Sequence, residues 1–397
     1  MRSIGRDPIF IDRGEGPFIW DVDGNRYVDW VASWGPLILG HADPLVVEAV
    51  RAAAGRGTSF GAPTAGEVEL ATEVAGRIAS VEMIRMTNSG TEATMSALRL
   101  ARAATGRTTI LKFAGAYHGH VDGLLAEGGS GLATAGVPAS PGVTEAQASD
   151  TVIVPWNNTE AVADAISRGR PAAVIAEPIP ANMGVVPPDA GFLEMLRDTT
   201  ADAGSLLILD EVISGFRVAR GGAQELLGVD ADLTVMGKVI GGGLPAAAYG
   251  GSRELMERIA PAGDVYQAGT LSGNPLAVAA GLATLRKLNG AAYVGIESVT
   301  TRLATGLRRA AGDRPVQVAS VPGLMTVFFS AEPVRDFAGA QACDANAYGR
   351  FCRAMLEAGV YPPASQFEAW FPSLAHDDES IELTIEAAGE AFERAID

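Results

Sequence analysis

Short apolar runs alternate with longer segments of helical periodicity through the middle of the chain. The strand-like runs are unbroken by polar residues over most of their length, and they are MIRMTN at 83–88, TTILKF at 108–113, AAVIAEPI at 172–179, SLLILDEV at 205–212 and LTVMG at 233–237. Helical segments lie between them, such as TEATMSALRLARAATG at 91–106. Continuous apolar strands separated by helices are typical of a mostly parallel sheet covered on both faces. The pattern therefore predicts an α/β fold.

The two ends of the chain follow a different pattern. Residues 18–30, FIWDVDGNRYVDW, contain β-like runs on both sides of an Asp-Gly turn, which predicts a hairpin. From about residue 291 a long amphipathic helix leads to a further strand, GLMTVFFS. We therefore predict a large unit over 38–288 and a smaller α+β unit built from 1–37 and 289–397.

One segment inside the large unit has no periodicity. Residues 127–142, EGGSGLATAGVPASPG, are rich in Gly, Ala, Ser and Pro. Such a composition favours irregular backbone over a helix or strand. We expect a mobile loop here.

Composition narrows the class of partner. The chain has 397 residues, of which 48% are hydrophobic and 19% charged, and its net charge is −17. The electrostatic field of this negative charge repels polyphosphates and anionic lipid heads, so nucleic acids and membranes are not expected partners. A role of the acidic residues in solubility alone explains the charge equally well. The opening MRSIGRDPIF has no apolar signal core, and no apolar run of about 18 residues occurs. Together with only two cysteines, Cys343 and Cys352, this predicts a cytoplasmic protein.

Lysine is rare, and one lysine has an unusual setting. Lysine occurs at positions 112, 238 and 287, which a coding bias towards arginine also explains. Lys238 lies in the apolar stretch TVMGKVIGGGLP, whereas Lys287 follows Arg286 near a helix end and is expected to be solvated. Lys112 alternates on a strand and is expected to face outward or pair locally. A desolvated lysine has a lowered pKa and serves as a neutral nucleophile near neutral pH, so Lys238 is the candidate reactive amine.

Polar residues gather where several predicted strands end. Ligands in open α/β sheets lie beyond the carboxyl ends of the strands, so these residues are expected to converge on one cleft. They are NSGT at 88–91, AYHG at 116–119, Asp210-Glu211 and Lys238. Glu177 ends another strand and is expected to orient loops rather than to react.

Each of these groups fits one part of a pyridoxal phosphate (PLP) site. NSGT at a helix start suits a phosphate dianion, Asp210 suits the protonated pyridine nitrogen, and the flat face of Tyr117 suits the ring. Each residue also has an ordinary explanation, as a helix cap, a salt-bridge partner or a core residue. The stretch AGTLSGNP at 268–275 is a second candidate for a phosphate contact.

The chain resembles the fold-type I PLP-dependent enzymes of the class III aminotransferase family, and within it the glutamate-1-semialdehyde 2,1-aminomutase branch. The resemblance covers almost the whole chain, in segments that follow the family's order: SWGPLILGHADP, SFGAPT, NSGTEATMSALRLARAATGR, YHGHVDGLL, LDEVISGFRVARGGAQE, GKVIGGGLP, VYQAGTLSGNPLA and SQFEAWFPSLAH. DEV with GK specifies only class III, whereas YQAGTLSGNP, SWGP and the Gly-rich loop point to the aminomutase branch. The family's fold has a mostly parallel seven-stranded sheet in its large domain.

The resemblance implies a role for each matching position. Lys238, Asp210 and Tyr117 are the catalytic residues: Lys238 forms the Schiff base, Asp210 pairs with the pyridinium, and Tyr117 stacks on the ring. The cofactor-binding residues are these three with Ser89, Gly90, Thr91, His118, Asn182, Val212, Gly269 and Thr270. The substrate residues are Trp34, Ser130, Tyr266 and Glu368. Gly269 and Thr270 reach the phosphate of the other subunit, so a homodimer is expected, and His118 with His120 lacks the third ligand of a metal site.

The implied reaction converts glutamate-1-semialdehyde to 5-aminolevulinate, a tetrapyrrole precursor, starting from the pyridoxamine phosphate form. A diamine must stay bound between the two amine transfers, and the loop with Ser130 would act as a gate that retains it. A second hypothesis is an ordinary class III aminotransferase that moves an amino group between another amino acid, such as a β- or aryl-amino acid, and a keto acid. A nucleotide-dependent oxidoreductase is disfavoured because no G-x-G-x-x-G opens a helix after a strand.

The sequence departs from the family pattern in places. The family has a further segment ahead of the position that aligns with Met1, and it holds a serine and an arginine that bind the substrate carboxylate. Either the true start lies upstream or the substrate differs. Ala114, Ala116 and Trp370 stand where the family usually has an acidic residue, a cysteine and a glycine, and Trp370 is expected to narrow the pocket. The exact substrate, its stereochemistry and the pathway stay open.

Overall fold

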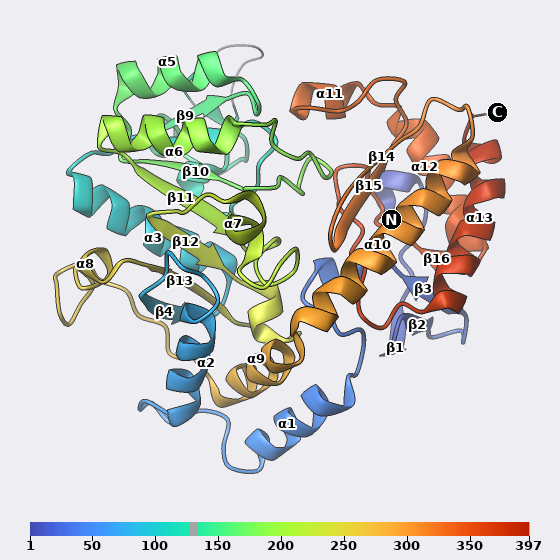
Figure 1. Cartoon of the computed structure of the whole chain (residues 1–397), viewed down its shortest axis with the longest axis horizontal. Coiled ribbons are helices and arrows are strands. Elements are labelled where there is room, and N and C mark those ends of the chain that lie inside the picture. Colours follow the sequence, from blue (N-terminus) through green and yellow to red (C-terminus); the bar gives the residue numbers. More distant parts are fainter. Residues whose placement is uncertain (128–133, 136, 397) are drawn as a thin grey trace.

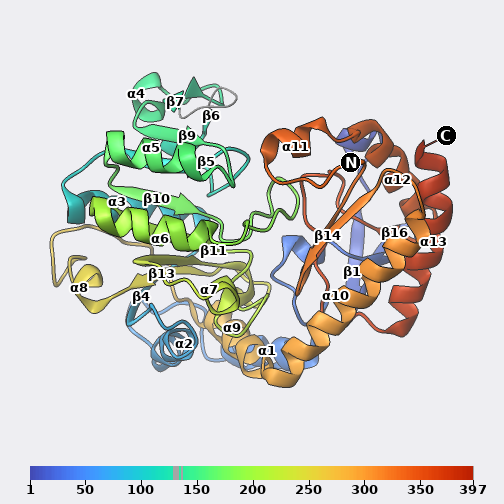
Figure 2. The ribbon, with the colours of Figure 1, turned by 45° about the horizontal axis from the view of Figure 1, so that its top comes forward.

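The computed structural model describes residues 1–127, 134–135 and 137–396 of the chain. The main sheet with its helices lies beside a second group of elements that comes from both ends of the sequence (Figures 1 and 2). Ser130 lies outside the described residues. Within the described ranges, none of the helices is long and apolar enough to cross a membrane.

The main sheet has the mostly parallel arrangement that the apolar runs predict. Its order is β4 (Met83–Thr87), β13 (Ala247–Gly251), β12 (Leu233–Met236), β11 (Leu206–Glu211), β10 (Ala173–Ala176), β5 (Ile110–Phe113), β9 (Thr151–Val154) and β7 (Thr134–Ala135). The strands from β12 to β9 are parallel, and β13 runs antiparallel to both of its neighbours. The seven strands from β4 to β9 confirm the predicted sheet, and β7 adds a two-residue antiparallel edge.

Apolar clusters cover both faces of this sheet, because successive side chains of a strand point to opposite sides and both sets are apolar here. In β11, Leu207 and Leu209 pack in one cluster with residues of α5 (Thr159–Gly169) and α6 (Phe192–Ala203). Ile208, between them, belongs to a different cluster, which contains the apolar side of α3 (Gly90–Thr105). The alternating side chains of the single apolar strand β11 therefore belong to two buried clusters, one on each face of the sheet.

Further helices surround one end of the main sheet. A third cluster joins α2 (Ala65–Ala75) and α9 (Pro275–Lys287) to β12, and α1 (Pro44–Ala54) packs along α9. The short elements around the main sheet as a whole are η3 (Asp122–Leu124), β6 (Ala126–Glu127), β8 (Val137–Pro138), α4 (Glu145–Ala148), α7 (Gly222–Leu227), η4 (Lys238–Gly241) and α8 (Arg253–Met256).

The elements from the two ends of the sequence pack on one another. The predicted hairpin is confirmed as β2 (Phe18–Asp21) and β3 (Arg26–Asp29), which pair antiparallel. β1 (Ile11–Glu15) continues this sheet on one side, and β16 (Val360–Tyr361) pairs parallel with β3 on the other. The remaining elements are η1 (Arg2–Ile4), η2 (Ala32–Trp34), α10 (Gly290–Ala311), β14 (Gln317–Val321), β15 (Leu324–Phe328), α11 (Phe337–Ala342), α12 (Ala345–Glu357) and α13 (Asp378–Ile396).

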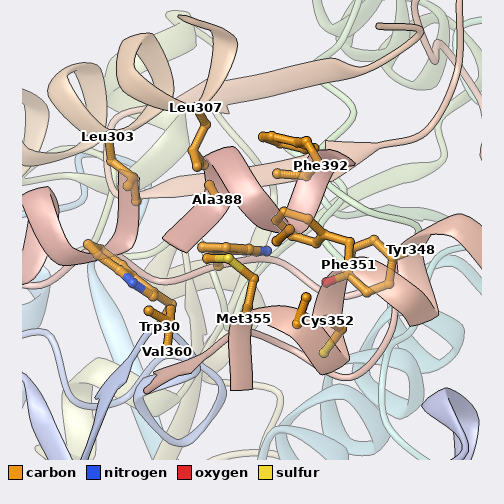
Figure 3. Close-up of a cluster of buried hydrophobic side chains, with 14 of the residues drawn as sticks. Trp30, Leu303, Leu307, Tyr348, Phe351, Cys352, Met355, Val360, Ala388 and Phe392 are labelled. Carbon is orange, nitrogen blue, oxygen red and sulfur yellow. The ribbon is translucent and has the colours of Figure 1, made fainter. Parts of the chain in front are cut away.

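A buried cluster holds these terminal segments together (Figure 3). Trp30 comes from the N-terminal segment, Leu303 from α10, Phe351 from α12 and Phe392 from α13, and all four side chains are fully buried. The rings of Phe351 and Phe392 stack with their centroids 4.7 Å apart. The boundaries proposed from the sequence, 38–288 against the two terminal segments, stay a prediction that this shared core supports.

Candidate functional site

A cavity of about 500 Å³ lies at the carboxyl ends of the main strands. It is lined by residues that follow β4, β5, β10, β11 and β12, and by Trp34, Glu368 and Phe371 from the terminal segments. The convergence expected from the sequence therefore occurs. The predicted residues that line the cavity are Trp34, Ser89, Gly90, Thr91, Tyr117, His118, Asn182, Asp210, Val212, Lys238 and Glu368.

Lys238 projects from a tight backbone turn at the end of β12. Its φ of +46° is in the left-handed region, and Gly237 before it is extended. A Cβ on Gly237 would lie 3.2 Å from Val212, so glycine lets the two segments approach. Burial lowers the pKa of the Lys238 ammonium, whereas the nearby carboxylates of Asp210 and Glu368 favour its charged form.

The other two lysines have different surroundings. Lys112 is buried and donates to the carbonyl oxygen of Leu124 at 2.9 Å, so the expectation that it faces outward is wrong and its local pairing is confirmed. It lies on β5, a strand whose two faces are both covered. Lys287 is partly exposed and forms an ion pair with Asp43 at 2.7 Å, which makes it less freely solvated than expected.

Asp210 and His118 form a buried pair at the base of the cavity. Nδ1 of His118 lies 2.8 Å from Oδ2 of Asp210, and Oδ1 of Asp210 accepts from the Val212 N–H at 3.0 Å. Where Asp210 is ionised it can only accept, so Nδ1 of His118 is then the donor of this contact. Among the described residues, Nε2 of His118 is buried without a hydrogen-bond partner.

Glu177 joins two loops of the cavity wall. One carboxylate oxygen accepts from the Tyr117 N–H at 2.9 Å, and the other accepts from the Ala181 N–H and from the Asn182 side chain at 2.9 and 3.0 Å. Burial raises the pKa of this carboxyl group. The loop-orienting role expected for Glu177 agrees with these contacts.

The start of α3 offers a site for an anion. Ser89 caps the helix, since its Oγ accepts from the Glu92 N–H at 3.2 Å. Gly90 and Thr91 are the next residues, and the first N–H groups of a helix have no partner inside it. A Cβ on Gly90 would lie 3.1 Å from Val212, so the helix start and β11 are closely apposed. Positive helix-dipole density and free N–H groups favour a phosphate here.

These groups together fit PLP. A buried carboxylate, a lysine with a lowered pKa and a helix start that suits an anion line one cavity, and they match the pyridine nitrogen, the aldehyde and the phosphate of that cofactor. Metal binding has no comparable support: among the described residues, no group of three His, Cys, Asp or Glu side chains could hold a metal ion.

Some predicted residues do not line this cavity. Gly269 and Thr270 lie in an exposed stretch of the same chain, and Tyr266 beside them is 71% exposed. Ser130 lies outside the described residues. The functional roles assigned to all these positions stay predictions.

The expectation that Trp370 narrows the pocket is wrong. Its side chain is fully buried in the terminal core, 6.4 Å from the ring of Phe351 and 6.2 Å from that of Trp30 between centroids. The next residue, Phe371, lines the cavity instead. The backbone of Trp370 pairs with Met325 of β15, and this pairing sends the indole ring away from the cavity.

Sequence reasoning also missed residues behind the cavity wall. Arg217 is fully buried although arginine normally predicts an exposed position. The only signal was its place in the segment GFRV, six residues after Glu211. Glu211 itself accepts hydrogen bonds from the N–H groups of Ala223 and Gln224, and so holds α7 against β11.

Comparisons with known proteins agree with this geometry. The family model described as Aminotransferase class-III matches residues 2–392. A curated glutamate-1-semialdehyde 2,1-aminomutase of Desulforudis audaxviator is 56% identical over 99% of this chain and 92% of its own length.

Two solved structures are also similar. An omega-transaminase from Sphaerobacter thermophilus superposes with a TM-score of 0.94 and 33% identity, over 100% of this chain and 93% of that chain. A glutamate-1-semialdehyde-aminomutase from Pseudomonas aeruginosa PAO1 in complex with PMP superposes with a TM-score of 0.89 and 28% identity, over 98% and 88%.

Proposed function

The chain belongs to the class-III aminotransferase family, and on that premise we propose that it binds PLP and converts glutamate-1-semialdehyde to 5-aminolevulinate by intramolecular amino exchange. This reaction supplies a precursor for tetrapyrrole synthesis. The observation that carries the proposal is the 56% identity, over nearly the whole chain, with a relative named for this reaction.

The residues of the cavity divide the task of holding the cofactor. When bound, PLP supplies an aldehyde that exchanges amines and a ring that stabilises negative charge on the neighbouring carbon. Asp210 would pair with the ring nitrogen, and His118 would hold Asp210 in place through the 2.8 Å contact. The start of α3, with Ser89, Gly90 and Thr91, would bind the phosphate. Tyr117 and Val212 would face the two sides of the ring, with Asn182 near its edge.

Lys238 is the residue proposed to move protons. Its lowered pKa favours a neutral amine, which can accept a proton at Nζ and return it during each amine transfer. The substrate would lie between this amine and the wall formed by Trp34, Glu368 and Phe371. Trp34 and Phe371 would limit water around the reacting atoms.

We also propose that two copies of the chain associate. In that arrangement Gly269 and Thr270 of the partner subunit would complete the phosphate site. Exposed apolar side chains support the proposal, because Tyr266 is 71%, Phe60 54% and Leu271 51% exposed in the single chain. A cytoplasmic location is proposed as well, and the two free cysteines are consistent with a reducing compartment.

The test uses purified enzyme loaded with cofactor and supplied with the semialdehyde alone. We expect 5-aminolevulinate to form without any added amino donor or keto acid, and to be lost in Lys238→Ala. In enzyme loaded with PLP, whose aldehyde can form an imine with a lysine, sodium borohydride should leave the cofactor attached to the peptide that contains Lys238. Lys287→Ala is the matched control, because Lys287 pairs with Asp43 outside the cavity and its loss should change neither result.

A second candidate function is amine transfer between another amino acid or amine and a keto acid. The observation that favours it is the TM-score of 0.94 with an omega-transaminase, against 0.89 with the aminomutase structure. Under this alternative the semialdehyde alone would give no 5-aminolevulinate, whereas addition of a keto acid and an amine donor would give transfer that still requires Lys238.

A further inference from the structure

Arg217 is a fully buried cation behind the cavity wall. It lies six residues after the end of β11, and among the described residues its guanidinium donates only to backbone carbonyl oxygens, those of Gly35, Pro372 at 2.9 Å and Gly323 at 3.2 Å. Within the described part of the chain, no carboxylate forms a salt bridge with Arg217, and its Nε has no hydrogen-bond partner.

Burial of an unpaired charge is costly, and the cost calls for a compensating role. Desolvation lowers the pKa of the Arg217 guanidinium to about 9. Carbonyl dipoles offset only part of the lost hydration. A neutral side chain of similar size would fill the same volume without that cost, so packing alone does not account for an arginine here.

The carbonyls that Arg217 binds belong to the cavity wall. Gly35 directly follows Trp34, and Pro372 directly follows Phe371, and both aromatic residues line the cavity. The guanidinium carbon also lies 5.2 Å from the centroid of the Phe371 ring. One side chain thus contacts two wall segments that are far apart in the sequence.

The segment before Gly35 has a backbone that needs support. Ala32, Ser33 and Trp34 have φ values of 46°, 57° and 60°, a left-handed conformation that non-glycine residues rarely adopt. A local strain of this kind persists only where surrounding contacts hold it. Asp29 accepts from the Val31 and Ala32 N–H groups at one end of the turn, and Arg217 binds Gly35 at the other.

Close contacts continue from this turn to the candidate reactive lysine. A Cβ on Gly35 would lie 2.9 Å from the Phe371 ring and 3.3 Å from Cδ of Lys238. Gly35 is therefore packed between the ring that Arg217 covers and the stem of Lys238. A shift of Gly35 or Phe371 would change the space around the amine.

We infer that Arg217 is a positioning residue for the proposed reaction, which fixes the Trp34–Gly35 and Phe371–Pro372 segments against Lys238. Burial is the main cause of the lowered pKa of Lys238, and the charge of Arg217 adds a smaller effect in the same direction, against that of the carboxylates. The inference rests on the proposed function for its effect on turnover, but its effect on Lys238 is a property of the protein alone.

The test compares Arg217→Met and Arg217→Lys with the control Arg77→Met. Arg77 is also a buried arginine that donates to carbonyls, those of Leu285 and Leu288, but unlike Arg217 it also pairs with the carboxylate of Glu73, and it lies outside the cavity. The first measurement is the pH dependence of Lys238 acylation by acetic anhydride in the cofactor-free protein, read from its peptide by mass spectrometry. The second is kcat and KM of the loaded enzyme.

We expect Arg217→Met to raise the pKa of Lys238 and to lower kcat/KM by about tenfold or more, since small displacements of reacting groups have effects of that size. Arg217→Lys keeps the charge but not the planar fork, so the pKa of Lys238 should stay close to that of the parent while KM rises. Arg77→Met should lower the melting temperature and leave both the acylation profile and KM unchanged.

An unchanged acylation profile in folded Arg217→Met would overturn the inference, as would equal shifts in Arg217→Met and Arg77→Met. If Arg217→Met does not fold, Arg217→Lys decides alone, and an unchanged KM in that variant contradicts the positioning role. Failure of the parent enzyme to form 5-aminolevulinate would count against the proposed function only, because the acylation experiment requires neither cofactor nor substrate.

Discussion

Nδ1 of His118 lies 2.8 Å from Oδ2 of Asp210, and the side chains of both residues are almost completely removed from solvent. The contact joins the loop after β5 to the end of β11, two segments on either side of β10 in the sheet. Together with the Val212 N–H, which donates to Oδ1 of Asp210 at 3.0 Å, this contact fixes the direction of the Asp210 carboxylate. His118 would therefore act on the proposed cofactor site through Asp210, which it holds in place.

Replacement of His118 by Phe should weaken PLP binding by about 10-fold or more. The phenyl ring fills the space but leaves Oδ2 of Asp210 buried without a donor, and a hydrogen bond to a charged group contributes about 1.5–3 kcal/mol. The dissociation constant is measured by titrating cofactor-free protein with PLP and following tryptophan fluorescence. His118→Asn retains a donor near the position of Nδ1 and should recover part of the affinity. Equal affinity in His118→Phe and the parent would contradict the role assigned to this contact.

A second prediction concerns the contact between the loop after β5 and the start of α3. Gly119 has a φ of +83°, and a Cβ there would lie 2.4 Å from Oγ1 and 2.7 Å from Cα of Thr91. Gly119→Ala should therefore displace Thr91 and weaken PLP binding, and the loss should be largest for the phosphate contribution. Comparison of PLP with pyridoxal, which lacks the phosphate, separates that contribution.

Gly142→Ala is the matched control for Gly119→Ala. Gly142 also has a positive φ, +95°, but a Cβ there would meet nothing within 4 Å. Both substitutions carry the backbone cost of a left-handed alanine, and only Gly119→Ala adds a collision. If the two variants bind PLP equally well, the collision with Thr91 does not matter to the site.

The periodicity of the sequence was sufficient for the sheet but not for its details. Apolar runs predicted β4, β5, β10, β11 and β12 within a few residues, because strands covered on both faces need unbroken apolar sequence. Their predicted ends extended too far, as at 172–179 against Ala173–Ala176, since Glu177 and Pro178 already belong to the loop. The run AAYGG of β13 was not predicted as a strand, because two glycines in five residues weaken that pattern.

The candidate site likewise contains some residues that the sequence pattern could place and others that it could not. Residues at strand ends could be placed from the sequence, since parallel strands bring their carboxyl ends to one edge. Trp34 and Glu368 lie far from those strands in the sequence, and only the family resemblance indicated them. The burial of Arg217 and of Lys112 was missed, because a charged residue in an amphipathic pattern is normally expected to face water.

A third prediction addresses the core that joins the two ends of the sequence. Phe351 is fully buried and stacks on the ring of Phe392 (Figure 3). Its ring centroid also lies 6.4 Å from that of Trp370. Phe351→Ala should lower the free energy of unfolding by about 3–5 kcal/mol, because it leaves a cavity among side chains from both terminal segments. Phe351→Leu should cost much less, about 1.5 kcal/mol. Urea denaturation followed by circular dichroism measures both, and similar losses for the two variants would show that the cavity is not the cause.

The last prediction follows from His376, which lies buried against Trp30 with the two rings stacked 3.8 Å apart. Its Nδ1 accepts from the Ser373 N–H at 3.0 Å, and its Nε2–H donates to the carbonyl oxygen of Asp29 at 3.0 Å, so the neutral ring satisfies both contacts. Burial lowers the pKa of His376 from its ordinary value of 6.5 to about 4, despite the opposing charge of Asp29.

Because the pKa of His376 is lower in the folded protein than in the unfolded chain, the unfolded chain binds the proton first as the pH falls. The protein should therefore lose stability between pH 6.5 and pH 4, by about 3 kcal/mol from this residue, at 1.36 kcal/mol for each unit of pKa shift. His376→Gln cannot titrate in this range, so its free energy of unfolding should start lower at pH 7 but fall less steeply towards pH 4. Urea midpoints measured for both proteins across this range provide the test. Parallel losses in parent and variant would mean that other groups, and not His376, cause the acid sensitivity.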